Sequence, residues 1–196
     1  AAALHRFDPS SGATASVTWS EPVLSIVVPS ADGGLVVATE AGIGSIDPST
    51  GVVARVGDLT PGPGLRMNDG NVDPDGRLWV GSMHHDFVAG AASLFVVDAH
   101  GGATTVLADV TCSNGIAWSP DRSTMFYVDT FTMHLDAFDV DATTGAVSNR
   151  RVVVEFDPAL GGPDGIAVDA DGALWVALWD GAAVHRYLPD GTLSAP

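Results

Sequence analysis

Short runs of alternating or β-branched hydrophobic residues recur along the whole chain, and each run is bounded by Asp, Gly, Pro or Asn. Runs of roughly four to eight such residues between turn residues are typical of β-strands. No window shows a long 3.6-residue period with capping residues, so the pattern predicts no long helix. The sequence therefore predicts an all-β protein. Clear examples of the predicted strands are residues 34–39, 78–81, 125–128 and 174–177.

Three stretches of the chain can be superimposed, and each has a glycine that serves as a marker. The markers Gly70, Gly115 and Gly165 are 45 and 50 residues apart, and a degenerate copy (Ser25 to Val37, with Asp32-Gly33-Gly34) begins 45 residues before Gly70. A period of this length is typical of the blades of a β-propeller. Rotational repetition places equivalent residues around one axis, so the polar residues just before the markers form a candidate site. These residues are Asp69, Asn114 and Asp164.

A second recurring motif is typical of the outer hairpin of a blade and occurs five times. The motif described above, which contains the marker glycines and belongs to the inner strands, occurs four times. The copy at Leu4–Gly12 precedes every inner motif, so we expect the chain to begin and end inside blades. A closed ring of four blades would leave this first hairpin without inner strands. Because a propeller is stable when its ring closes, we expect residues 1–196 to be a single domain and an incomplete propeller of roughly four blades. The other outer copies are residues 44–51, 94–98, 136–145 and 185–191.

Composition narrows the classes of partner and chemistry. The formal net charge is −16, from 24 acidic and 8 basic residues, and every basic residue is arginine. An acidic surface argues against nucleic acid as a partner. The absence of lysine excludes Schiff-base chemistry and a P-loop lysine. No apolar run approaches the roughly 18 residues of a membrane span.

The cysteine content and the first residues bear on the compartment. Cys112 is the single cysteine, so an internal disulfide is excluded and a reducing compartment is permitted. The opening Ala1-Ala2-Ala3 is followed at once by polar residues, which is no signal-peptide pattern. We therefore expect a cytoplasmic protein, with Cys112 as a small buried residue.

Two acidic turns, Asp73–Gly76 and Asp169–Gly172, invite an EF-hand interpretation. An EF-hand loop needs a glutamate at its twelfth position, where this chain has His84 and Asp180. Flanking helices are not predicted either. Hairpin turns, in which Asp bonds its own backbone and Gly takes a positive φ, explain both segments better.

The candidate site around the expected axis comprises one cation and several oxygen donors. Carboxylate and amide oxygens suit a hard divalent ion such as Ca²⁺ or Mg²⁺ and argue against a zinc cage of nitrogen and sulfur. A nearby arginine could hold a polyhydroxy or carboxylate ligand through its planar fork. The alternative is that these are turn residues that cap the blades, where Asn-Gly and Asp-Gly are common. The residues are Arg66, Asn68, Asp69, Asn114 and Asp164.

Several motifs in register resemble those of the regucalcin/gluconolactonase family. They are Arg66–Gly70, Ser113–Ser119, Tyr127–Asp129, Pro163–Gly165 and Leu174–Ala177, and the likeness extends through essentially the whole chain. The resemblance implies a six-bladed β-propeller with one divalent metal at the mouth of the channel. It also implies hydrolysis of small sugar lactones.

The same resemblance assigns roles to individual residues. It implies that Asn114 and Asp164 are metal ligands, that Arg66 and Asn68 bind substrate, and, more weakly, that Asp86 stands for a substrate-binding glutamate of the family. Asp164 would also serve as general base or proton shuttle, beside a cation that polarises the lactone carbonyl. Ca²⁺ is the expected metal, with Zn²⁺, Mg²⁺ and Mn²⁺ as the other possibilities.

The chain departs from the family pattern at one ligand. The family's third metal ligand is a glutamate that precedes the motif at Leu4–Gly12, whereas Glu21-Pro22 follows that motif and is no substitute. These 196 residues match about four of six blades, so we expect weaker metal binding and little activity from them alone. Two other functions stay open: a non-catalytic calcium-binding regulatory propeller, and a hydrolase or isomerase-like protein that acts on another lactone or ester.

Overall fold

The computed structural model describes residues 2–19, 23–31, 33–47, 50 and 53–195, so Glu21, Pro22, Asp32 and part of the outer motif at 44–51 lie outside the described residues. The described chain forms eighteen β-strands and two single-turn 3₁₀ helices, η1 (Thr130–Thr132) and η2 (Pro158–Leu160), and contains no α-helix. No helix among these residues is long and apolar enough to cross a membrane. The all-β fold that the hydrophobic alternation predicts is confirmed.

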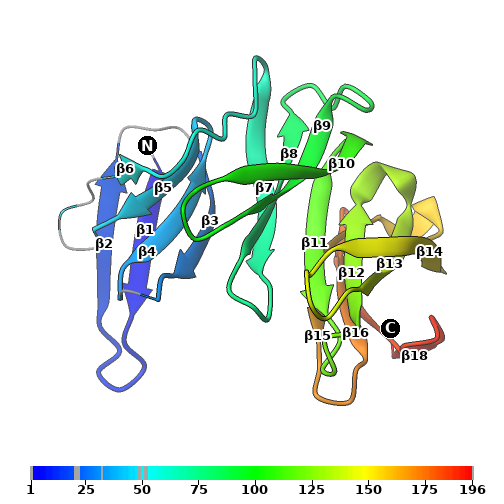
Figure 1. Ribbon diagram of the computed structural model, residues 1–196. Helices are drawn as coiled ribbons and strands as arrows, with labels where there is room; N and C mark the ends of the chain where they lie inside the picture. Colours follow the sequence, from blue (N-terminus) through cyan, green and yellow to red (C-terminus); the bar gives the residue numbers. More distant parts are fainter. Residues whose placement is uncertain (1, 20–22, 32, 48–49, 51–52, 196) are drawn as a thin grey trace.

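Most strands belong to four antiparallel sheets of four strands each, which are arranged as propeller blades (Figure 1). Within each blade the strands follow one another in chain order, and a separate hairpin of two strands precedes the blades. The hairpin is β1 (Ala2–Phe7) and β2 (Thr14–Trp19); blade 1 is β3 (Leu24–Pro29), β4 (Leu35–Thr39), β5 (Gly42–Ile46) and β6 (Val53–Arg55); blade 2 is β7 (Leu65–Val72), β8 (Leu78–His84), β9 (Ala92–Val97) and β10 (Ala103–Val110); blade 3 is β11 (Ser113–Trp118), β12 (Thr124–Asp129), β13 (His134–Val140) and β14 (Val147–Glu155); blade 4 is β15 (Gly162–Val168), β16 (Leu174–Trp179), β17 (Ala183–Tyr187) and β18 (Leu193–Ala195).

The first strands of the blades are the inner strands of the propeller. β7 lies beside both β3 and β11, and β11 lies beside β15. The marker glycines Gly70, Gly115 and Gly165 lie in β7, β11 and β15. The sequence repeat therefore corresponds to the structural repeat, and the markers lie around a common axis as expected.

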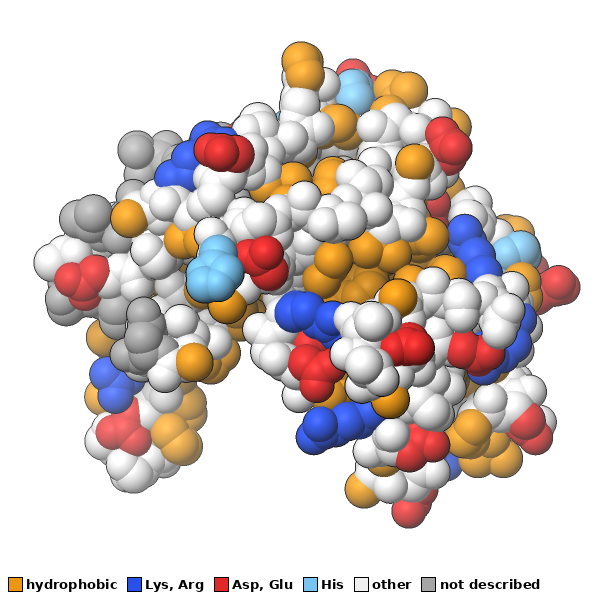
Figure 2. All heavy atoms as spheres, in the orientation of Figure 1, with side chains coloured by type: hydrophobic (Ala, Val, Ile, Leu, Met, Phe, Trp, Pro, Cys, Tyr) orange, Lys and Arg blue, Asp and Glu red, His pale blue; other side chains and the backbone are white. Residues whose placement is uncertain are grey.

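The hydrophobic core lies between the blades and is divided into three clusters. One joins blades 1 and 2, one joins blades 2 and 3, and one joins blades 3 and 4. Tyr127, buried completely, belongs to the middle cluster, and its hydroxyl donates to Ser113 Oγ at 3.0 Å. Hydrophobic side chains also fill a hollow between the outer parts of blades 2 and 3, while charged side chains are scattered over the same face (Figure 2). Burial between neighbours is what holds the blades together.

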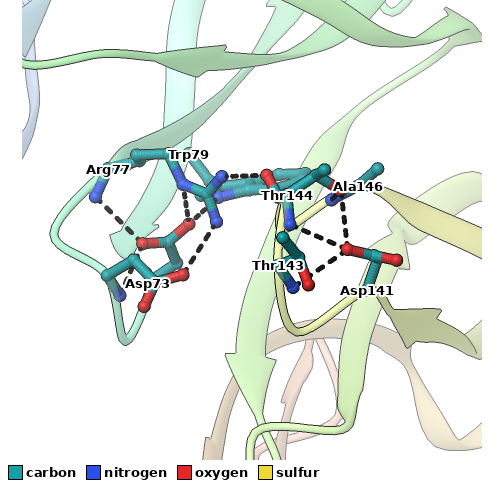
Figure 3. Close-up of polar contacts among 8 residues, drawn as sticks. Asp73, Arg77, Trp79, Asp141, Thr143, Thr144 and Ala146 are labelled. Carbon is teal, nitrogen blue, oxygen red and sulfur yellow. Dashed lines mark hydrogen bonds and ion pairs between the residues drawn. The ribbon is translucent and has the colours of Figure 1, made fainter.

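The acidic turns are hairpin turns, as the sequence predicts. Asp73 Oδ1 accepts from the backbone N–H groups of Asp75 and Arg77, and Oδ2 accepts from Arg77 Nε and from the indole Nε1 of Trp79 (Figure 3). Arg77 also donates to the carbonyl oxygen of Thr144 at 2.7 Å. Thr144 lies in the turn between β13 and β14. One buried carboxylate thus orders its own turn and, through Arg77, ties blade 2 to blade 3.

Candidate functional site

A β-bulge interrupts the inner strand of every blade near its start. The register shifts between residues 24 and 26 in β3, 67 and 70 in β7, 113 and 116 in β11, and 163 and 166 in β15. A bulge leaves a residue out of the ladder and turns its side chain in a new direction. The polar residues at these bulges all line one open cavity of about 760 Å³. They are Ser25, Asn68, Asp69, Asn114 and Asp164.

The glycine after the bulge in β11 allows a close approach of two inner strands. A Cβ at Gly115 would lie 2.7 Å from the carbonyl oxygen of Asp164, which is too close for any other residue. Because no side chain separates the strands there, the backbones that carry Asn114 and Asp164 lie next to one another. The marker glycine of β11 is therefore part of the reason that the two polar side chains share a cavity.

Hydrogen bonds fix the orientation of the two asparagine amides. Asn68 Nδ2 donates to the Ser113 carbonyl oxygen at 2.8 Å and to Asn114 Oδ1 at 3.0 Å. Asn114 Nδ2 donates to Thr130 Oγ1 at 2.7 Å, and Thr130 in turn donates to the Pro163 carbonyl oxygen at 2.8 Å. The two carbonyls can only accept, so each amide has one orientation. Asn114 Oδ1 is left with a second lone pair, and Asn68 Oδ1 has no partner among the described residues.

Two carboxylates at the cavity carry charge that their surroundings do not compensate. Burial raises the pKa of Asp69, against the lowering effect of the Gly70 N–H, and the negative charge of Asp164 raises it further. Burial likewise raises the pKa of Asp164, and the Gly165 N–H opposes it. A cation bound between the two groups would favour their ionised forms.

The donor set fits a hard divalent cation. The cavity offers carboxylate oxygens from Asp69 and Asp164 and an amide oxygen from Asn114. In the described part of the chain, no three His, Cys, Asp or Glu residues gather as a metal cage would require. Oxygen donors in this mixture suit Ca²⁺ or Mg²⁺ better than zinc.

The structure brings together five of the six residues that the sequence assigns to the site, and leaves the sixth apart. The residues that line the same cavity are Arg66, Asn68, Asp69, Asn114 and Asp164. Asp86 lies in the turn after β8, its side chain is 86% exposed, and it lines neither cavity at the site. The structure therefore gives no contact through which Asp86 would bind a ligand in that cavity.

Cys112 is buried beside the site, as the sequence predicts. Burial, together with the nearby Asp129 carboxylate, raises the pKa of its thiol to about 11. A thiol with this pKa is almost entirely protonated at neutral pH and is a poor nucleophile. Cys112 is therefore a small buried residue in the wall of the smaller cavity, and its thiol is a poor candidate for a nucleophile.

Sequence reasoning missed a group of aromatic residues beside the site. Phe87, Phe131 and Trp179, with Thr130, line a smaller cavity of about 180 Å³ that also includes Arg66, Asn68, Asn114 and Asp164. A signal was present, because the three aromatic residues follow the marker glycines of their blades by 17, 16 and 14 residues.

The chain is similar to proteins of one family. The profile of the SMP-30/Gluconolactonase/LRE-like region matches residues 1–195. Regucalcin of Xenopus laevis is 35% identical over 193 residues, which are 94% of this chain and 64% of that protein. The 6-deoxy-6-sulfogluconolactonase of Pseudomonas putida is 36% identical over 190 residues, which are 96% of this chain and 65% of that protein.

Solved structures agree with the sequence matches. The crystal structure of the calcium-binding protein regucalcin from Agrobacterium tumefaciens superimposes with a TM-score of 0.91 and 34% identity, over 98% of this chain and 65% of that one. The chain thus spans slightly less than two thirds of the length of these relatives. Since the profile covers nearly every residue, the chain belongs to the SMP-30/Gluconolactonase/LRE-like family.

Proposed function

We propose that the cavity at the inner strands is the active site of a metal-dependent hydrolase that opens sugar lactones. The observation that carries this proposal is the convergence of Asn68, Asn114 and Asp164 on one cavity through bulges in three different blades, with Arg66 lining the same cavity. Membership of a family that includes 6-deoxy-6-sulfogluconolactonase supports lactone hydrolysis as the reaction class.

In this mechanism Asp164 takes a proton from water while the water oxygen attacks the lactone carbonyl carbon. The ring C–O bond then breaks, and the proton passes from the Asp164 carboxylate to the departing alkoxide oxygen, which gives the hydroxy acid. The side chain of Asp164 lines the cavity, where its carboxylate can reach a water molecule beside the substrate. When bound, a divalent cation would polarise the lactone carbonyl and stabilise the negative charge on its oxygen.

The remaining residues bind and orient the substrate. The Arg66 guanidinium presents a planar set of donors for the oxygens of the lactone. Asn68 Oδ1 can accept from a substrate hydroxyl, because its Nδ2 already donates to Ser113 and Asn114. Because Asn114 Nδ2 donates to the Thr130 hydroxyl, Asn114 Oδ1 points away from Thr130 and is available to a cation.

A second candidate function is a calcium-binding propeller without catalytic activity. The similar structure from Agrobacterium tumefaciens is described as a calcium-binding protein, and the oxygen-only donor set fits that ion. Such a protein would bind metal at the same residues and hydrolyse no lactone.

An assay of glucono-δ-lactone hydrolysis, in which the release of acid is measured, distinguishes these two functions. The assay is run with Ca²⁺, Mg²⁺, Mn²⁺ or Zn²⁺ and after chelation. We expect turnover that depends on metal and is low for these 196 residues alone, a loss of about a hundredfold or more in Asp164→Asn, and a rise mainly in KM in Arg66→Ala. Metal binding without turnover of any lactone would favour the regulatory propeller, and an undiminished rate in Asp164→Asn would exclude Asp164 as the base.

A further inference from the structure

Three aromatic rings from three blades form a cluster that we call the aromatic collar: Phe87, Phe131 and Trp179. The ring centroids are 5.2 Å apart for the two phenylalanines and 6.5 Å from each of them to Trp179. The rings are 44%, 46% and 53% exposed, so their contacts with one another leave about half of their surface open. A cluster that served only to bury apolar surface would be covered more completely.

The collar lies at the same end of the inner strands as the site. Phe87 follows β8, Phe131 lies in η1 after β12, and Trp179 ends β16. These second strands run antiparallel to the inner strands, so their ends pair with the beginnings of β7, β11 and β15. The collar accordingly lines the cavity of about 180 Å³ that also includes Arg66 and Asp164.

Hydrogen bonds and backbone conformation hold the collar in place. Thr130, the residue before Phe131, accepts from Asn114 and donates to the Pro163 carbonyl oxygen, which couples the collar directly to the site. Phe87 itself has a φ of 52°, in the left-handed region that bulky residues seldom adopt.

We propose that the aromatic collar binds an apolar substituent of the substrate, so that the preferred lactone carries an alkyl or aryl group. This inference rests on the lactone hydrolysis proposed above and changes the preferred substrate from a sugar lactone to a lactone with an apolar substituent. In this arrangement Arg66 and the polar side chains of the cavity would take the lactone carbonyl and ring oxygen, whereas the collar offers three partly exposed aromatic rings for the substituent. Ligand pockets commonly combine a few polar groups with an aromatic wall in this way.

The test compares two lactones with the same six-membered ring, δ-nonalactone and glucono-δ-lactone. We expect kcat/KM to be higher for δ-nonalactone. Trp179→Ala and Phe131→Ala are expected to lower kcat/KM for δ-nonalactone at least about tenfold, mainly through KM, and to change the value for glucono-δ-lactone less than about threefold. Val184→Ala is the control, because Val184 lies in the neighbouring strand β17, is 52% exposed and lines neither cavity at the site.

The outcomes separate failure of this inference from failure of the proposed function. Equal losses for both lactones, or a preference for glucono-δ-lactone that the collar variants leave unchanged, would overturn the role of the collar. If the protein hydrolyses neither lactone, the proposed hydrolase is wrong, and the collar is judged by binding of 2-butyltetrahydropyran in saturation-transfer NMR. Binding that disappears in Trp179→Ala would support the collar, and absence of binding to the wild type would overturn it.

Discussion

Aspartates lie at both ends of the inner strands, but those at one end have many more hydrogen-bond partners than those at the other. At the turn end, Asp73 and Asp169 each have both carboxylate oxygens occupied by backbone N–H groups, an indole Nε1 and an arginine. At the cavity end, Asp69 accepts from the Gly70 N–H at 2.8 Å, and burial raises its pKa and that of Asp164.

This difference distinguishes the carboxylates that stabilise the fold from those that are available to a ligand. A carboxylate with every oxygen bonded has its charge stabilised in the folded chain and gains little from a further partner. A partly buried carboxylate with spare acceptor capacity destabilises the folded chain until a cation or a proton arrives. The turn end of the propeller therefore holds the fold together, and the cavity end is suited to binding and catalysis.

The largest expected effect comes from the same substitution at the two ends of blade 2. Asp73→Asn removes the charge that Arg77 and the Trp79 indole face, and should cost about 2–3 kcal/mol of unfolding free energy. In metal-free protein Asp69→Asn should cost nothing and instead stabilise the fold, because it removes a buried charge but keeps the acceptor for Gly70 N–H. Urea denaturation after chelation measures both. Equal losses in the two variants would show that the two ends do not differ.

A smaller effect is the opposite dependence of the two ends on pH. The Arg186 guanidinium and the Trp175 indole lower the pKa of Asp169 to about 2. Its stabilisation is therefore fully present above the ordinary pKa of about 3.8 and is lost as pH falls towards 2. The pKa of Asp69 is raised, so the folded state binds its proton first and acidification relieves the cost of its charge.

Thermal melting of metal-free protein between about pH 7 and pH 2 tests these signs. The Asp69→Asn variant should have a higher Tm than the wild type at neutral pH. This difference in Tm should decrease as the pH falls towards the ordinary pKa of an aspartate side chain. Asp169→Asn should lose less stability than the wild type on acidification from about pH 4 to about pH 2. Parallel melting curves for the three proteins would contradict both assignments.

The repeat in the sequence predicted the blades and most of the site, because both depend on local patterns. Turn residues and strand alternation are local, and a fixed period carries equivalent residues to one axis. The convergence of Asn68, Asn114 and Asp164 on one cavity followed from that logic and from the resemblance to the family. Their metal-binding and catalytic roles stay predictions.

Other features depend on neighbours that a local pattern does not show. Trp79 and Trp175 occupy equivalent positions of the repeated motif, yet Trp79 is 2% exposed and Trp175 is 42% exposed. The ring centroids of Trp79 and Trp118, which lies in blade 3, are 5.9 Å apart. The exposure of Asp86 and the contact of Thr130 with Asn114 are likewise set by how loops meet across strands. Bulges belong to this class too, since a register shift is a property of two strands together.

We propose that Asn114 and Asp164 belong to one cation site at the cavity end of the inner strands. Calorimetric titration of the chelated protein with Ca²⁺ tests it most directly, with Asp164→Ala as the site variant and Asp169→Ala as the turn-end control. We predict that Ca²⁺ binds the wild type and the Asp169→Ala protein with similar affinity and that binding is lost in Asp164→Ala. Binding that survives Asp164→Ala unchanged would contradict the assignment of Asp164 as a metal ligand.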